Sequence, residues 1–259
     1  MPIAPLTATA GVVLRGFLSE RSLPIGLVLV LASFGGGMLL GDASLAGEGR
    51  IESNLAWLVA ELLGGLLALA HGAGLVGRRG VLGAFALARP IPAGLLLAGR
   101  FLGLAAGLFL YVVAVSVTLS GWLFLAHGAG VAAILGLGWL LWLRLIVVLA
   151  VSTLLLALAR PTAAAPLAAL ISLAGWLAAS FPGTGSPAAL KAIRWFASLV
   201  VPDLPALDPP IAGLPGSFAA VGLELLGPTL YAVFYTAAMV AAAVTVFPWR
   251  ARRPAAPGS

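Results

Sequence analysis

Residues 131–158 read VAAILGLGWLLWLRLIVVLAVSTLLLAL, an uninterrupted apolar run that contains one charged residue, Arg144. A helix that crosses a bilayer needs about 20 predominantly apolar residues, so this run is long enough to span a membrane. Its apolar residues are continuous rather than alternating, which argues against a strand of a transmembrane β-barrel. Arg160-Pro161 follows and marks the end of the run. The stretch therefore predicts a transmembrane helix.

The composition of the whole chain agrees with this interpretation. Of 259 residues, 62% are hydrophobic and 8% are charged, whereas an ordinary soluble domain is about 25% charged. So few charges cannot cover the surface of a soluble protein of this size. In a soluble protein the net charge of +6 would suggest a nucleic-acid partner, but here the basic residues lie at the ends of apolar runs. We therefore expect a lipid bilayer, and no nucleic acid, as a partner.

Further apolar runs predict a bundle of six transmembrane helices within residues 23–248. The expected spans cover residues 23–40, 54–76, 101–124, 131–158, 163–180 and 228–248. Residues 1–22 are expected to form an interfacial helix, because apolar residues recur there at three- and four-residue spacings. The proline-rich segment 181–227 predicts a cap of short outer helices between the last two spans, and 249–259 a cytoplasmic tail. The expected fold is all-α, a single polytopic membrane domain over residues 1–259.

The basic residues predict the orientation of this bundle. With six spans both termini lie on one side, and ten arginines fall on that side: Arg15, Arg21, Arg78, Arg79, Arg89, Arg100, Arg160, Arg250, Arg252 and Arg253. Only Arg50, Lys191 and Arg194 fall on the other side. Since basic residues concentrate in cytoplasmic loops, we expect both termini in the cytoplasm of a multi-pass protein of the inner or plasma membrane.

The sequence holds few residues that carry chemistry. It has no cysteine, and its two histidines, His71 and His127, fall near opposite membrane faces, so no shared metal site is expected. A P-loop needs a Gly-Lys pair, but the only lysine, Lys191, follows Leu190. We expect no enzyme activity and no cofactor in this chain, so that any ATP and magnesium would be bound by another subunit.

Two charged residues lie within predicted spans. Glu61 falls several residues into the second span, and Arg144 falls near the middle of the fourth. A charge at the centre of a membrane helix costs at least ~2.5 kcal/mol, so such residues pair with each other or line a substrate path. The sequence leaves both interpretations open.

Residues 74–104 read GLVGRRGVLGAFALARPIPAGLLLAGRFLGL, in which a span ends, a short apolar stretch follows, and Pro90 and Pro92 precede the next span. Three of its elements are Arg79-Gly80, Leu87-Ala88-Arg89-Pro90-Ile91 and Gly99-Arg100. Val201-Pro202-Asp203-Leu204-Pro205 and Ala159-Arg160-Pro161-Thr162 occur later. In this order they resemble the corresponding elements of the permease subunits of ABC-2 transporters, and the resemblance extends over nearly the whole chain.

The resemblance implies a permease subunit that works with a separate ABC ATPase subunit and with a second copy or a paralogue of itself. Residues 80–89 then correspond to a cytoplasmic coupling helix, with Arg100 opening the third span. The residues expected to contact the ATPase are Arg78, Arg79, Val81, Leu82, Phe85, Leu87, Arg89 and Pro90. Many family members carry an acid in the turn after the second span, where this chain has two arginines.

Two other functions compete with the transporter hypothesis. A membrane anchor or scaffold subunit, without transport activity, is favoured by the scarcity of polar residues in the spans. An ion-coupled carrier usually needs several intramembrane ionisable groups or broken helices, and Glu61 alone gives it little support.

Overall fold

The computed structural model describes residues 3–20, 24, 26–32, 35, 50–74, 92–127, 131–178, 201–207 and 218–251. Within these ranges the regular elements are helices and no strand occurs, which confirms the all-α fold class. They are α1 (Ile3–Leu18), α3 (Arg50–Gly72), α5 (Ala93–His127), α6 (Val131–Leu158), α7 (Pro161–Ala178), the 3₁₀ helix η1 (Pro205–Leu207) and α9 (Phe218–Ala251).

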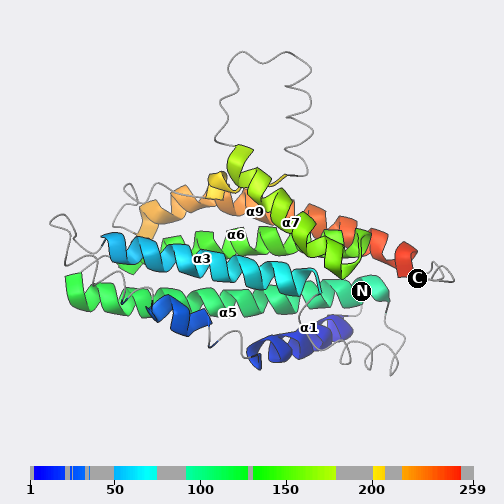
Figure 1. The fold of residues 1–259 in the computed structure, drawn as a ribbon, viewed down its shortest axis with the longest axis horizontal. Helices are drawn as coiled ribbons and strands as arrows, with labels where there is room; N and C mark the ends of the chain where they lie inside the picture. The colour runs from blue at the N-terminus through cyan, green and yellow to red at the C-terminus, as the bar shows by residue number, and fades with distance from the viewer. Residues whose placement is uncertain are drawn as a thin grey trace, which may run out of the picture.

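Helix α6 lies at the centre of the bundle, and α3, α5, α7 and α9 all contact it (Figure 1). Neighbouring residues give the directions of the helices. Gly64 and Gly72 of α3 lie against Leu145 and Ser152 of α6, so these two helices run parallel. The Trp142 indole of α6 bonds to Ala105 O of α5, and Gly138 lies against Ser116 further along, so α5 and α6 run antiparallel.

Four described helices are long and apolar enough to cross a membrane: Leu55–Gly72, Ala93–Gly121, Ile134–Leu158 and Leu225–Pro248. They carry large apolar side chains on their outer faces, such as Leu66 of α3 and Phe234 of α9, as expected of helices that face lipid chains. The protein is therefore a membrane-embedded helical bundle. Helix α7 occupies the predicted fifth span, and only part of the predicted first span, 23–40, is described; the count of six spans stays a prediction.

The predicted starts of the third and sixth spans are wrong, and a proline lies near each of them. Helix α5 begins at Ala93, not at residue 101, because Pro92 supplies the carbonyl that accepts from the amides of Leu95 and Leu96. Proline suits a helix start, where its missing N–H needs no partner. Helix α9 begins at Phe218 and continues through Pro228, so the predicted last span, 228–248, is part of a longer helix. Membrane helices tolerate such prolines.

Helix α3 also differs from the predicted second span, 54–76. It begins at Arg50 and ends at Gly72. Its end is marked by Gly74, whose φ of +74° favours glycine over residues with a side chain and whose amide donates to His71 O. Helix α7 begins close to the predicted start of the fifth span, residue 163. Pro161 is its first helical residue, and the amides of Ala163 and Ala164 donate to Arg160 O.

Helix α1 packs along the first half of α5 through glycines spaced four residues apart. A methyl group at Gly99 would lie 2.8 Å from Thr9 Cβ, and one at Gly103 would lie 2.5 Å from Ala10 O. Further along, Gly107 faces the ring of Phe17. Small residues allow membrane helices to approach this closely. The predicted helix at the N-terminus is thus present and runs parallel to α5; its location in the membrane interface stays a prediction.

Candidate functional site

The bundle contains a charge pair at the middle of its central helix. Arg144 of α6 donates from Nη1 to Glu61 Oε1 of α3, so the structure brings together the two intramembrane charges found in the sequence. The Arg144 side chain is 8% exposed, whereas the Glu61 side chain is 26% exposed. An isolated charge at this depth costs at least ~2.5 kcal/mol, and the pairing offsets that cost.

Arg144 also contacts two further elements. Its Nη2 donates to Leu207 O of η1 at 3.3 Å, and its guanidinium lies 5.6 Å from the ring centroid of Trp176 of α7. A cation held over an indole ring is attracted by the electrons of the ring face. One side chain therefore connects α3, α6, α7 and η1.

The segment 201–207 is non-helical for most of its length, yet it reaches the depth of Arg144. The side chains of Pro202, Leu204 and Leu207 are almost fully buried. Pro202 O lies directly against Gly175 of α7, and the Asp203 amide donates to Tyr231 Oη of α9 at 2.7 Å. Irregular backbone at membrane depth is tolerated where protein surrounds it. The sequence predicted only an outer cap here and missed this burial.

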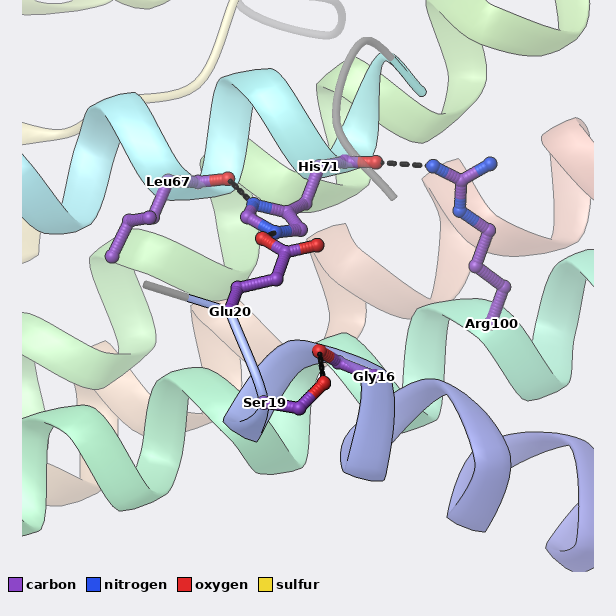
Figure 2. A network of polar contacts seen from close by, with 6 residues as sticks. All are labelled: Gly16, Ser19, Glu20, Leu67, His71 and Arg100. Carbon is purple, nitrogen blue, oxygen red and sulfur yellow. Dashed lines mark hydrogen bonds and ion pairs between the residues drawn. The ribbon is translucent and has the colours of Figure 1, made fainter. Parts of the chain in front are cut away.

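A second polar cluster lies where α3 ends (Figure 2). The carboxylate of Glu20, just after α1, lies 2.7 Å from His71 Nε2 of α3. On the other side of the ring, His71 Nδ1 lies 2.9 Å from Leu67 O. The ring of Phe17 meets the imidazole edge-on, with 4.9 Å between centroids. The cluster ties the end of α1 to α3.

Arg100 completes this cluster from α5 (Figure 2). Its Nη2 donates to His71 O at 2.5 Å, and its guanidinium packs over Gly74. A cation at this position satisfies a carbonyl at the end of α3 and opposes the negative end of the helix dipole. The sequence suggested that Arg100 lies at the start of the third span. In the structure Arg100 lies inside α5, and its side chain caps the end of α3.

Sequence reasoning did not connect Glu20 with His71. The two residues are 51 positions apart, and no spacing rule relates side chains at such a separation. The available signal was weaker: each is an ionisable residue next to a long apolar run. Within the described residues, no group of three histidine or acidic side chains is placed to hold a metal ion.

The chain matches no protein-family model, and no curated protein shows significant similarity to it. The residues expected to contact an ATPase, from Arg78 to Pro90, lie outside the described ranges. What the structure gives is the position of the two helices on either side of them. The end of α3 and the first turns of α5 are joined through Arg100 and His71 O.

The two polar clusters join several helices to α3. Both include α3, and Glu61 and His71 lie about 15 Å apart along it at 1.5 Å per residue. The cluster at His71 joins α3 to α5 and to the end of α1, while the pair at Glu61 joins α3 to α6, α7 and η1. A displacement of α3 would therefore affect every element that these contacts join.

Proposed function

We propose that this chain is the membrane-spanning subunit of an ATP-driven transporter of the ABC-2 type. A separate ABC ATPase subunit binds ATP and magnesium, and a second copy or a paralogue of this chain completes the translocation path. Both termini lie in the cytoplasm, and the assembly resides in the inner or plasma membrane. The order of the motifs within residues 74–104 and 159–205 supports the proposal, as does the membrane-embedded bundle.

The observation that carries the proposal is the junction between α3 and α5. Arg100 bonds to the last turn of α3 and packs over Gly74, so the two helices on either side of residues 75–91 are joined to each other. The apolar residues of that stretch, including Phe85, suit burial in a partner's groove. A partner that pulls on the stretch moves α3 and α5 together.

The charge pair offers a route from this junction to the rest of the bundle. Because Arg144 holds Glu61, Leu207 O and Trp176 at once, a shift of α3 changes the environment of α6, α7 and η1. Allosteric transitions of this kind need contacts with two discrete arrangements. In the proposed cycle, ATP binding closes the ATPase subunits. The Glu61–Arg144 pair then changes between one arrangement in the inward-open state and another in the outward-open state.

The test is co-purification of the tagged chain with its ATPase in mild detergent, followed by measurement of ATP hydrolysis. Phe85→Ala removes the expected anchor, and buried anchors of this kind contribute ~2 kcal/mol or more to an interface. We expect the ATPase to be lost from this variant while the bundle stays folded. Phe234→Ala, a matched truncation of a 71% exposed phenylalanine on α9, should retain it. Equal recovery of an ATPase with both variants would contradict the proposal.

A non-transporting anchor subunit is the second candidate. The contact between the two intramembrane charges favours it, since Glu61 and Arg144 bond to each other. A paired charge serves the stability of the bundle and needs no substrate path to explain it. Reconstitution separates the two functions. A transporter subunit stimulates ATP hydrolysis when substrate is supplied to proteoliposomes, whereas an anchor leaves the hydrolysis rate unchanged.

A further inference from the structure

We propose that water, and not lipid, contacts the α7 side of the bundle down to the depth of Arg144. This side consists of the flank of α3 that carries Glu61 and Gly65, the end of α7 at Trp176, and residues 201–207. The inference concerns what surrounds these residues, so it holds for a transporter and for an anchor subunit alike. It identifies the surface from which a water-soluble molecule can reach the charge pair.

The elements of the α7 side lie next to one another. Arg144 contacts Glu61, Trp176 and Leu207 O at once, so α3, the end of α7 and the segment 201–207 meet around one guanidinium. Helix α5 packs on α6 away from α7 (Figure 1). The α7 side is therefore one region of the surface, on the other side of α6 from α5.

Glu61 is partly exposed on this side. It lies six residues after Leu55, where the apolar stretch of α3 begins, so it is about 9 Å inside that stretch. Its side chain is 26% exposed even though it bonds to Arg144. Ionisable residues within membrane helices face the protein interior or water. The exposed part of this side chain therefore points to water next to α3.

Asp203 is a second acidic residue of the α7 side, and it is exposed. Its amide donates to Tyr231 Oη at 2.7 Å, and Tyr231 lies six residues after Leu225, where the apolar stretch of α9 begins. This separation corresponds to about 9 Å along the helix. A carboxylate among lipid chains at such a depth is costly, whereas water solvates it. The exposure of Asp203 therefore agrees with that of Glu61.

The backbone of residues 201–207 supports the same conclusion. Non-helical backbone at membrane depth is tolerated where it is buried in protein or lines a water-filled space. Pro202, Leu204 and Leu207 are buried, whereas Asp203 and Ala206 are exposed. The segment thus packs on the protein with one face, and the other face needs water.

Other sides of the bundle have a different surface at the same depth. Helix α9 exposes Phe234 at 71%. Trp139 of α6 donates to Thr229 of α9, and five residues further along these two parallel helices lie Arg144 and Phe234. Phe234 is therefore level with the charge pair but surrounded by lipid. The large exposed side chains of α5 are also apolar, among them Phe109, Val113 and Val117.

The test compares spin labels at three positions of equal depth on the full chain in nanodiscs. The labels are attached to cysteines that replace Gly65, Ala206 or Phe234, and the natural chain has no cysteine. Gly65 follows Gly64, which lies against Leu145, and a methyl group at Gly65 would have no neighbour within 4 Å. Collisions of each label with a water-soluble nickel chelate and with oxygen, which concentrates in lipid, are measured by electron paramagnetic resonance.

We expect frequent collisions with nickel at positions 65 and 206, and frequent collisions with oxygen but rare ones with nickel at position 234. An oxygen-dominated result at 65 or 206 would show lipid there and would overturn the proposal. Rare collisions with both reagents at either position would show that another protein covers this side, and would overturn it as well.

Two measurements without spin labels test the same proposal. In opened membranes Ala206→Cys should react with a polar maleimide much faster than Phe234→Cys, because a thiol ionises readily in water but not in apolar surroundings. Asp203→Asn removes the charge but keeps the oxygen that accepts from the amide of Ala206. With water at this position the midpoint of thermal unfolding in nanodiscs should not change. Equal reactivity of the two cysteines, or a raised midpoint in Asp203→Asn, would contradict the proposal.

Discussion

At the scale of single residues, Arg144 and Glu61 form an ion pair within the described bundle. Each charge is acceptable at this depth because the other is present. The sequence located both residues but left open whether they pair, because a single sequence does not show which helices are neighbours. The structure gives the adjacency of α3 and α6, together with the contacts to Leu207 O and Trp176.

Removal of one partner should cost more than removal of both. In Glu61→Leu the guanidinium of Arg144 stays buried without its carboxylate, and loss of one member of a buried pair typically costs about 3–5 kcal/mol. The double variant Glu61→Leu, Arg144→Met leaves no charge behind and should recover most of this loss. Thermal unfolding in detergent, followed by circular dichroism, measures both variants. If the double variant is as unstable as the single one, the charge is not the source of the cost.

At the scale of helices and loops, the length of the apolar runs predicted where the described helices lie, but it did not predict their first and last residues accurately. The run at residues 131–158 matches α6 because nothing in it competes with a helix and Pro161 starts the next one. Two prolines led to wrong helix starts. Pro92 was interpreted as part of a break before the helix, although α5 begins directly after it, and Pro228 was interpreted as a helix start, although it lies inside α9. The burial of 201–207 and the bond between Glu20 and His71 depend on contacts between distant segments, which local patterns do not contain.

The contact between α1 and α5 should be sensitive to any side chain at Gly103. A Cβ there meets the backbone carbonyl of Ala10 at 2.5 Å, and backbone cannot move aside without moving α1. Overpacking typically costs about 1–3 kcal/mol, which corresponds to a factor of about 5 to 150 in an equilibrium. We expect Thr9→Cys to react with a maleimide faster by about this factor in Gly103→Val, because α1 is displaced from α5 more often. Thr9 is 3% exposed in the natural chain.

Gly121 provides the control for this experiment. It lies on the same helix, but a methyl group there would have no neighbour within 4 Å. Gly121→Ala should leave the reactivity of Thr9→Cys unchanged. Equal reactivity of Thr9→Cys in the Gly103→Val and Gly121→Ala backgrounds would show that α1 does not need the glycine contact.

At the scale of the whole molecule, the described ends of the chain lie at one end of the bundle. Thr9 of α1 lies against Gly99, and Val244 of α9 lies against Gly94, both near the start of α5 (Figure 1). Two termini at one end agree with an even number of spans. The charge distribution, with ten basic residues against three, predicts that this end is cytoplasmic.

The orientation can be measured directly because the natural chain has no cysteine. A cysteine that replaces Ser186, in the segment expected on the outer face, should react with an impermeant maleimide added outside intact cells. Reaction only after the cells are opened would reverse the predicted topology. A cysteine added after Ser259 should behave in the opposite way, since the C-terminus is expected inside.

The most direct test of the proposed transporter function is photocrosslinking from position 85 in native membranes. A photoreactive residue that replaces Phe85 should form a covalent product with a protein that contains a P-loop, identified by mass spectrometry. The same residue in place of Phe234, which is exposed on α9, should not form that product. Crosslinking of position 85 to lipid alone, or to no ATPase, would contradict the assignment of this chain as the membrane subunit of an ABC transporter.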